Sequence, residues 1–324
     1  MRFSIVIPAM NRQETLDYTI KTIQACNFED SEIIVHDGAS ETPLVVPDGV
    51  KLFRAEDNRS MCTDWNSALS YANGDYIILI GCDDGILPHA LHDIDNILDD
   101  MNTPPLIRWN RCYYTWKDEF FAQRSGELQI TIGGSSFMMD SHKLISAASR
   151  VELDYTFLPM LYTSAIRRDL LDELIAKTGK VVDDISPDIY SGFAFASLVD
   201  KVPSINKAMT INAGSRWSTG VNNLSIGNTK ICEDFHFNNI RDNLLYDDRI
   251  PLNKTQTLWG SIKNSFYKAC ENGLIDEATL DGNPGRIAFD GQVIYEKADD
   301  VFEASVIAGE ILRNEKYDLS FKNW

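Results

Sequence analysis

The chain is 324 residues long and carries 30 lysine and arginine residues against 48 aspartate and glutamate residues, a formal net charge of −18. Hydrophobic residues make up 44% and charged residues 24%, ordinary proportions for a globular protein with a large core. So negative a chain does not suit extended nucleic acid or a polybasic membrane anchor, because both need clustered lysine and arginine. We therefore expect no nucleic-acid partner. A polyanionic ligand would need local help from a metal ion, a few arginines or a helix N-terminus.

Membrane and export signals are weak in this chain. No segment reaches the roughly 18 consecutive apolar residues of a membrane-spanning helix. The apolar N-terminal run ends at Pro8 and lacks the small-residue cleavage site of a signal peptide. The six cysteines have no Cys-x-x-Cys spacing, which favours reduced thiols. Together these features predict a cytoplasmic protein.

The first hundred residues alternate between strand and helix patterns. Apolar runs typical of buried strands occupy 3–7, 32–36, 51–54 and 76–80. Helical spacing lies between them, over about 13–25 and 65–72 and from Pro88 onward, with Asn11 expected to cap the first helix. Continuous apolar strands that alternate with helices predict an α/β fold, with a mostly parallel sheet covered by helices on both faces.

Beyond residue 105 the pattern is less regular. Strand patterns occupy 106–115 and 127–140, the second interrupted by Gly133-Gly134. Helical patterns follow over 168–177, 187–200, 228–245, 254–272 and 300–313, so the C-terminal third is expected to be largely helical. The turn-rich loop 214–223 is long enough to act as a lid, although a plain surface loop has the same composition.

Polar residues follow three of the predicted strands at the point where each strand ends. These clusters are Pro8–Arg12, Asp37–Ser40 and Asp83-Asp84. The carboxyl ends of parallel strands meet at one edge of a sheet, so the clusters predict a shared binding crevice. The adjacent carboxylates of Asp83 and Asp84 suit Mg²⁺ or Mn²⁺, although an exposed acidic turn has the same pattern. Asp37 taken alone is better explained as an Asx-turn that caps the loop 37–40.

The order and spacing of three segments resemble glycosyltransferase family 2, whose members are nucleotide-sugar-dependent enzymes of the GT-A fold. The segments are SIVIPAMNR (4–12), EIIVHDGAS (32–40) and GDYIILIGCDD (74–84). The resemblance implies a mostly parallel GT-A type sheet flanked by helices, with a Rossmann-like nucleotide-binding half and an α-helical C-terminal appendage. We expect a catalytic domain over 1–225, with a nucleotide-sugar-binding half (1–103) and an acceptor-binding half (104–225), followed by a helical region over 226–324.

The resemblance also implies a donor-binding role for individual residues. Pro8, Ala9 and Met10 would line the nucleoside pocket, and Asp37 would contact the base or the ribose. Met10 departs from the family pattern, because an aromatic residue is common at this position. The second acid that commonly follows Asp37 is replaced by Gly38.

The remaining donor residues surround the diphosphate. Asp83 would lie near the ribose or sugar, and Asp84 would hold a divalent metal, Mn²⁺ or Mg²⁺, on the diphosphate. Arg59 lies in a stretch where family members often place a basic residue near the nucleotide. The leading acid of the family's metal motif is Gly81 here, which leaves only the adjacent carboxylate pair. In the loop 214–223, Arg216 and Trp217 could close over the diphosphate.

An inverting transfer needs a base that takes the proton of the acceptor hydroxyl. Asp188 begins a predicted helix about a hundred residues after the metal motif, where the family usually carries its base. An acid in the first turn of a helix is equally explained by the helix dipole. Asp183 and Asp184 are the other candidates for this role.

The resemblance implies an inverting glycosyltransferase that moves a sugar from a nucleoside-diphosphate sugar, with a UDP-sugar as first choice, to a hydroxyl of a glycan or lipid-linked glycan. Bacterial surface-polysaccharide biosynthesis is the expected setting, with possible peripheral contact at the inner face of the membrane. One alternative is a sugar nucleotidyltransferase, although Pro8–Asn11 lacks that class's usual glycine-rich loop with a basic residue. Another is a non-catalytic module that binds nucleotides or sugars on the same fold.

Overall fold

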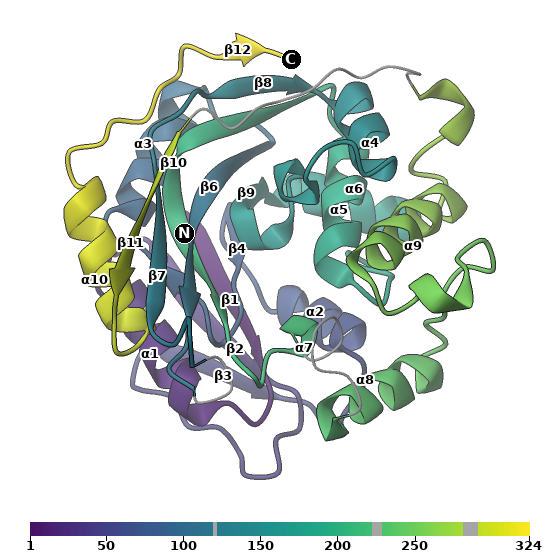
Figure 1. Ribbon diagram of the computed structural model, residues 1–324, viewed down its shortest axis with the longest axis horizontal. Coiled ribbons are helices and arrows are strands. Elements are labelled where there is room, and N and C mark those ends of the chain that lie inside the picture. The colour runs from purple at the N-terminus through teal and green to yellow at the C-terminus, as the bar shows by residue number, and fades with distance from the viewer. Residues whose placement is uncertain (119–121, 222–228, 281–290) are drawn as a thin grey trace.

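A computed structural model describes residues 1–118, 122–221, 229–280 and 291–324. Its described strands form one mixed sheet in the order β12-β8-β10-β6-β9-β4-β1-β2-β3, with β5, β7 and β11 branching from this path (Figure 1). The strands are β1 (Phe3–Ala9), β2 (Ser31–Asp37), β3 (Val50–Arg54), β4 (Tyr76–Leu79), β5 (Gly85–Ile86), β6 (Leu106–Thr115), β7 (Glu127–Ile132), β8 (Phe137–Asp140), β9 (Ser164–Arg167), β10 (Lys201–Gly214), β11 (Gln292–Lys297) and β12 (Lys322–Asn323).

Helices flank this sheet. They are α1 (Gln13–Gln24), α2 (Met61–Ser70), α3 (Ala90–Asp100), α4 (Ser141–Ser149), α5 (Arg168–Thr178), α6 (Pro187–Ser197), α7 (Thr219–Val221), α8 (Lys230–Arg241), α9 (Leu258–Glu271) and α10 (Val301–Leu312). Short 3₁₀ turns cover Tyr155–Phe157, Leu161–Thr163, Leu252–Lys254 and Glu277–Thr279. The predicted α/β class, with a sheet flanked by helices, is confirmed.

The first half of the sheet is parallel, as its sequence pattern predicts. β1 lies between β2 and β4 and pairs with both in parallel, so that Ile5 aligns with Ile33 on one side and Ile78 on the other. β3 extends this parallel half beyond β2. Farther along, β9 pairs antiparallel with β4 and β6, while β6 and β10 run parallel. Strands beyond β4 therefore pair in both directions, and the fully parallel part is confined to the first hundred residues.

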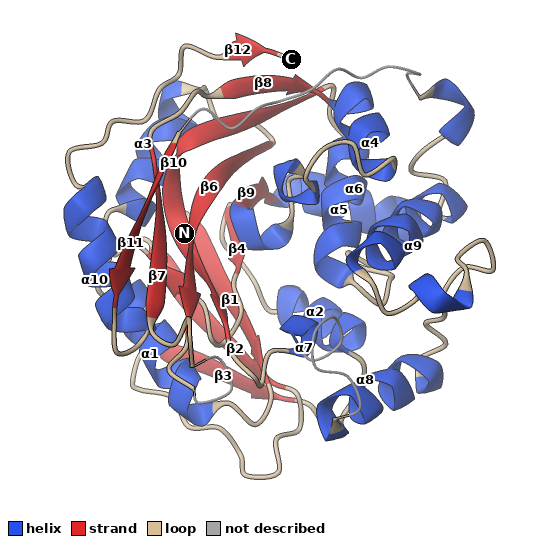
Figure 2. Cartoon of the chain, viewed as in Figure 1, coloured by secondary structure: helices blue, strands red, loops and turns tan. Residues whose placement is uncertain are grey.

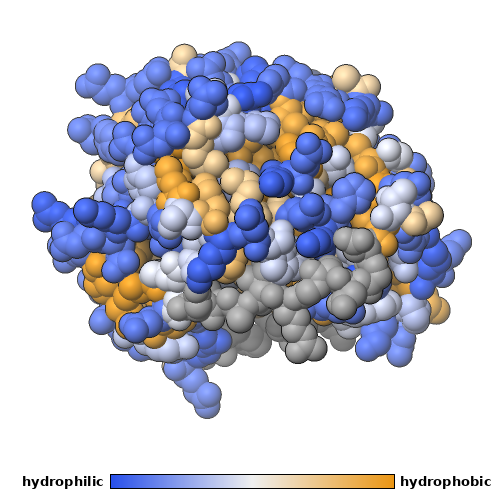
Figure 3. All heavy atoms as spheres, turned by 90° about the horizontal axis from the view of Figure 1, so that it is seen from above, coloured by the Kyte–Doolittle hydropathy of each residue, from blue (hydrophilic) through white to orange (hydrophobic). Residues whose placement is uncertain are grey.

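Two hydrophobic cores lie on the two faces of the sheet, as the helix positions in Figure 2 show. One contains Trp65 of α2, Phe193 of α6 and Phe266 of α9. The other contains Ile20 of α1 and a matching apolar row of α3 and α10. Polar residues dominate the face seen in Figure 3, with apolar residues in separate patches. Among the described helices, none has the length and apolar character that crossing a bilayer requires.

The C-terminal residues contain the three helices predicted near 228–245, 254–272 and 300–313, as α8, α9 and α10. They also contribute two strands that were not predicted: β11 pairs with β7, and β12 pairs with β8. β12 has only two residues, too few for a recognisable pattern. Since α10 also joins the core beside α1, this region completes the sheet and its covering layers. The boundary at residue 226 stays a prediction.

One predicted helix cap is wrong. Asn11 has a φ of 55°, and α1 instead begins at Gln13 after Arg12. The Asn11 side chain accepts a hydrogen bond from the Glu41 backbone N–H at 2.8 Å, and its own N–H donates to Ser40 Oγ at 2.8 Å. Asparagine tolerates the left-handed conformation, so here it joins two loops and leaves the helix uncapped.

Candidate active site

The loops that follow β1 and β2 meet at the carboxyl edge of the sheet, as predicted. The Gly38 N–H donates to the Ala9 carbonyl at 2.8 Å. The third polar cluster reaches them through the loop after β10. There Ser218 Oγ donates to Asp83 Oδ2 at 2.7 Å, and Arg12 Nη2 donates to the Trp217 carbonyl at 2.6 Å. The three strand ends therefore meet at one place, which we call the crevice.

Asp37 is buried at the end of β2 and holds its own loop. Its carboxylate accepts hydrogen bonds from the Ser40 N–H at 2.8 Å and the Leu44 N–H at 3.2 Å, and it forms an ion pair with Arg54. Burial alone would raise the pKa of Asp37, but these donors lower it overall. The predicted contact between Asp37 and a base or ribose stays a prediction. In this structure the carboxylate makes the Asx-type turn that was its alternative explanation.

Asp83 and Asp84 lie in the turn that follows β4, beside the crevice. Asp84 is buried, with Oδ1 accepting from the Ala213 N–H at 2.7 Å and Oδ2 from the Gly81 N–H at 2.9 Å. Burial, followed by the charge of Asp83, raises the pKa of Asp84 to about 7. Burial also raises the pKa of Asp83, although Ser218 and Arg12 oppose the change. The two adjacent carboxylates, Asp84 buried and Asp83 partly exposed, therefore concentrate negative charge that a bound cation would offset.

The space beside Gly81 fits a divalent cation that shares its ligands with a substrate. A Cβ atom on Gly81 would lie 2.7 Å from Asp84 Oδ2 and 3.1 Å from Asp83 Oδ1, so both carboxylates approach one point. Within the described ranges, no three His, Cys, Asp or Glu side chains gather into a metal cage. Mg²⁺ and Mn²⁺ often take one or two carboxylates and complete their shell with phosphate oxygens and water. The residues present suit that kind of site.

The acceptor half supplies the opposite wall of the crevice. Arg111 of β6, Tyr162 and Asp84 lie close together there, and the gap between them leaves no room for a water molecule. Asp188, in the first turn of α6, acts electrostatically on Arg111 and Tyr162. Burial raises the pKa of Asp188, and Arg111 partly opposes that change. Arg111 thus acts electrostatically both on Asp84 and on the predicted base.

Asp183 and Asp184, the other candidates for the base, are used in packing. Asp184 accepts hydrogen bonds at 2.5 Å from both Asn264 Nδ2 and Ser265 Oγ of α9. Asp183 pairs with Lys180 at 2.5 Å and accepts from Asn272 at 3.0 Å. Both carboxylates tie this segment to α9. Of the three acids, Asp188 is the one that neighbours Arg111.

The remaining predicted donor residues are placed as follows. Pro8 and Ala9 end β1, and Met10 begins the loop beside the Gly38 contact. Their role in a nucleoside pocket stays a prediction. Arg216 forms an ion pair with Asp118 at 3.0 Å and stacks on the Trp217 ring at 4.5 Å. The described residues of the predicted lid therefore fold against the crevice, whereas 222–223 lie outside the described residues.

Arg59 forms a bidentate contact with Asp242, the residue that ends α8. Its Nε and Nη2 atoms donate to Asp242 Oδ1 at 2.8 and 2.6 Å. Thr63 Oγ1 and the Ser60 N–H donate to the other carboxylate oxygen at 2.7 and 2.9 Å. The guanidinium therefore joins the start of α2 to the end of α8. Its predicted role near a nucleotide stays a prediction.

Asp242 should make folding stability sensitive to acid. Burial alone would raise its pKa, but hydrogen bonds from Ser60, Arg59 and Thr63 lower it strongly overall. A carboxyl group whose pKa is lowered on folding stabilises the protein at pH values above its unfolded pKa of about 3.9. This contribution is lost as the pH falls through the pKa of the folded state. We expect the unfolding free energy of the wild type to fall more steeply below about pH 4 than that of Asp242→Asn. Urea unfolding between pH 7 and 2.5 measures this, and equal slopes would contradict it.

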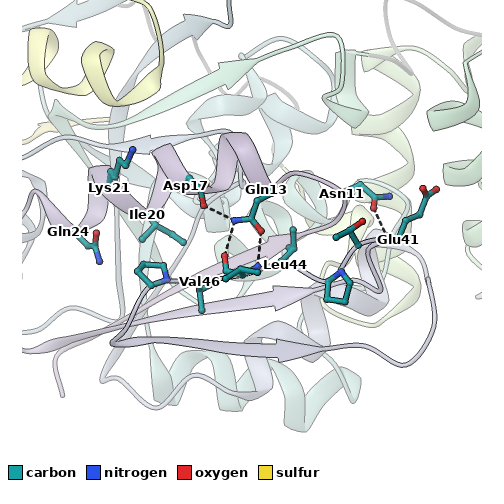
Figure 4. Close-up of a pocket in the computed structure, with 13 residues that line it drawn as sticks. Asn11, Gln13, Asp17, Ile20, Lys21, Gln24, Glu41, Leu44 and Val46 are labelled. Atoms are coloured by element: carbon teal, nitrogen blue, oxygen red, sulfur yellow. Dashed lines mark hydrogen bonds between the residues drawn. The ribbon is translucent and has the colours of Figure 1, made fainter.

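A surface groove lies outside the crevice, between α1 and the segment 41–47 (Figure 4). Its volume is about 1030 Å³. The Gln13 side chain closes one side of it, accepting from the Val45 N–H at 2.7 Å and donating to the Val45 carbonyl at 2.8 Å. The residues that line this groove include neither Asp83 nor Asp84, so it is separate from the carboxylates of the metal motif.

Arg111 and Tyr162 were missed by the sequence analysis. Arg111 is a charged residue inside the predicted strand 106–115, and a cation placed in a buried strand is the signal that could have identified it. Tyr162 lies in a short 3₁₀ turn without a recognisable motif. Its proximity to Asp84 depends on strands that are far apart in the sequence.

Residues 4–145 match the family described as Glycosyl transferase family 2. Among curated proteins, a segment of 99 residues is 33% identical to the GalNAc(5)-diNAcBac-PP-undecaprenol beta-1,3-glucosyltransferase of Campylobacter jejuni subsp. jejuni serotype O:2. The match covers 28% of this chain and 32% of that protein, so the chain spans about a third of the relative's length.

Two solved structures are also similar to this chain at low sequence identity. S. aureus TarS 1-349 in complex with UDP has a TM-score of 0.48 at 13% identity, covering 99% of this chain and 100% of that one. The mannosyltransferase PcManGT from Pyrobaculum calidifontis, in complex with GDP-Man and Mn²⁺, has a TM-score of 0.42 at 15% identity, covering 65% and 56%. Similarities at this level define no residue correspondence. The family match includes the polar residues at the ends of β1, β2 and β4, so residues 4–145 of this chain are similar to glycosyltransferase family 2.

Proposed function

We propose that this protein is an inverting glycosyltransferase that moves a sugar from a nucleoside-diphosphate sugar to a hydroxyl of a glycan or lipid-linked glycan. The observation that carries the proposal is the crevice itself. Paired carboxylates, Asp83 and Asp84, end β4 opposite Arg111 and Asp188. The family match over residues 4–145 supports the reaction class. A relative named as a glucosyltransferase of an undecaprenol-linked glycan supports bacterial polysaccharide biosynthesis as the setting.

The donor diphosphate would lie beside Asp83, the partly exposed carboxylate of the pair, where the charge of Arg111 reaches it. Asp83 and Asp84 would hold a divalent cation, Mn²⁺ or Mg²⁺, which supplies positive charge for the departing diphosphate. Arg111 would add a fixed positive charge on the opposite side, where a guanidinium suits phosphate oxygens. The nucleoside would occupy the ends of β1 and β2, beside Ala9 and Gly38. A UDP-sugar is our first choice of donor.

Asp188 would take the proton from the acceptor hydroxyl. As that proton moves to the carboxylate, the acceptor oxygen forms a bond to the anomeric carbon, and the bond from this carbon to the diphosphate oxygen breaks. The electron pair leaves with the nucleoside diphosphate, whose charge Arg111 would help to stabilise. Attack and departure on opposite faces of the sugar make the transfer inverting.

The acceptor side would lie near α8. Phe237, Ile240 and Leu245, at this helix or just beyond it, are 65, 66 and 62% exposed. These apolar side chains would allow a cytoplasmic enzyme to reach a lipid-linked glycan at the membrane surface. Their exposure supports peripheral contact at the inner face of the membrane as part of the proposal.

Thermal unfolding with nucleoside diphosphates tests the reaction class. We expect UDP, GDP or dTDP to raise the melting temperature with Mn²⁺ present, and the increase to disappear with EDTA, because the diphosphate and the cation would bind together. A ligand at 100 times its Kd stabilises the folded state by about 2.7 kcal/mol, which is readily measured. Failure of all diphosphates to shift the transition, with Mn²⁺ present, would contradict a nucleotide-dependent enzyme and favour a non-catalytic module.

A further inference from the structure

The place of the missing acid after Asp37 is filled by a carboxylate from another element. Residue 38 is glycine, so β2 itself supplies no second acid. A Cβ atom on Gly38 would collide with Asp64 Oδ2 and would lie 3.1 Å from Asp64 Cγ. Asp64 belongs to the first turn of α2, whose N-cap is Ser60. The carboxylate of α2 therefore occupies the volume into which an acid at position 38 would project.

Unlike Asp37, Asp64 has carboxylate oxygens that can still accept hydrogen bonds. The Asp37 oxygens are used by Ser40, Leu44 and Arg54. In the described part of the chain, no protein group donates a hydrogen bond to the Asp64 carboxylate, whose side chain is 14% exposed. A carboxylate that is largely removed from water and accepts no hydrogen bond is costly, and a donor from a ligand would relieve that cost.

A second buried group points into the same space. His36 is 2% exposed, and its Nδ1 atom lies 4.0 Å from Asp64 Oδ1 without a hydrogen-bond partner in the structure as described. Unpartnered buried ring nitrogens are uncommon and call for a physical explanation. A ring nitrogen next to a carboxylate offers two adjacent polar contacts on one edge. Such an edge suits a planar ligand with adjacent polar atoms.

The surrounding charges favour a neutral donor over a further anion. Burial raises the pKa of Asp64 to about 7, and Asp242, Asp37 and Asp57 add to that increase. Arg59 opposes the increase, but it is already bound to Asp242. A phosphate or carboxylate would be repelled at this position. An N–H group of an uncharged ring would not be repelled there.

We propose that Asp64 is the specificity-determining acid of the nucleoside pocket, and that its carboxylate accepts the ring N–H of a uracil, thymine or guanine base. This inference rests on the proposed function. A base with a ring N–H donates directly to the carboxylate and places a carbonyl oxygen beside it, within reach of the His36 edge. Adenine and cytosine present a ring nitrogen lone pair in place of that N–H, which would face the carboxylate and be repelled. Asp64 thereby selects the donor's base.

Calorimetric titration with UDP, GDP, CDP and ADP, with Mn²⁺ present and at about pH 8.5, where Asp64 is ionised, tests this assignment. The wild type should bind UDP or GDP at least about tenfold more tightly than CDP and ADP. Asp64→Asn should weaken binding of the preferred diphosphate by about tenfold or more, as expected for loss of a hydrogen bond to a charged group, and should remove the preference. Asp57→Asn, which removes an exposed acid of the same neighbourhood, should keep both affinity and preference.

Placing an acid at position 38, directly after β2, in place of Asp64 gives a second, independent measurement. Gly38→Asp alone should weaken binding, because its side chain would collide with Asp64. The double variant Gly38→Asp/Asp64→Ala should restore the affinity and base preference that Asp64→Ala loses. A wild type that prefers UDP or GDP while Asp64→Asn keeps that preference would overturn this inference and leave the proposed function standing. No binding of any diphosphate by a folded wild type would overturn both.

Discussion

Replacing Asp84 by asparagine is expected to lower kcat/KM for sugar transfer by about a thousandfold, because neutralising the diphosphate in the transition state is worth several kcal/mol. The Asp84 carboxylate lies beside Asp83 and across a narrow gap from Arg111. Asparagine has a similar shape but carries no charge for a cation. The loss should therefore appear in Mn²⁺-dependent binding of the diphosphate as well as in turnover.

Protein folding should survive this substitution. One amide oxygen can still accept from Gly81 or Ala213, and the cost of a buried charge is removed. Melting temperature and circular dichroism measure this directly. Asp172→Asn, which changes an exposed acid of α5, is the matched control and should retain wild-type turnover. Metal-stimulated transfer by Asp84→Asn at wild-type rates would contradict the assignment of Asp84 to the cation.

Replacing Asp188 by asparagine is expected to reduce kcat by about 10²- to 10⁴-fold while leaving the Kd of the nucleoside diphosphate unchanged. A general base acts on the acceptor hydroxyl and does not touch the nucleotide. Burial raises the pKa of Asp188, so the wild-type kcat should increase with pH through a pKa above the ordinary carboxyl range, as the base loses its proton. That increase should be absent from the residual activity of the variant.

Asp183→Asn provides the control for this prediction. It lies in the same segment, but its carboxylate pairs with Lys180 and Asn272 in packing against α9. We expect a lower melting temperature for this variant with little change in kcat. Steady-state kinetics and equilibrium titration on both variants separate the two roles. If Asp183→Asn lost more turnover than Asp188→Asn, the base would be misassigned.

Local sequence patterns were sufficient for the architecture around the crevice. Uninterrupted apolar runs place β1, β2 and β4 in a buried parallel sheet, since such runs satisfy both faces of a strand covered by helices. The polar residues that follow each run then lie at one edge. The break at Gly133-Gly134 also follows from sequence, because both residues have positive φ values, 65° and 92°, that glycine adopts without strain.

The short elements and the distant pairings could not be predicted in this way. β12 has two residues, and the contact between Arg59 and Asp242 joins residues 183 positions apart. Neither the two-residue strand nor the contact between distant residues produces a periodic pattern in the local sequence. Arg111 reaches the crevice only because β6 lies beside β10, which carries the backbone N–H that holds Asp84. Such neighbours follow from strand order, and strand order is a property of the whole sheet.

The sequence by itself determined the α/β class, the crevice at the ends of the strands and the family motifs of residues 4–84. Only the tertiary structure decided which carboxylates remain available for chemistry. Asp37 and Asp184 have their oxygens occupied by donors from loops and helices, whereas Asp64 does not. The physical reason is that a residue's type and spacing follow from local sequence, while the hydrogen bonds, burial and charges that set its reactivity come from groups that the fold brings to it.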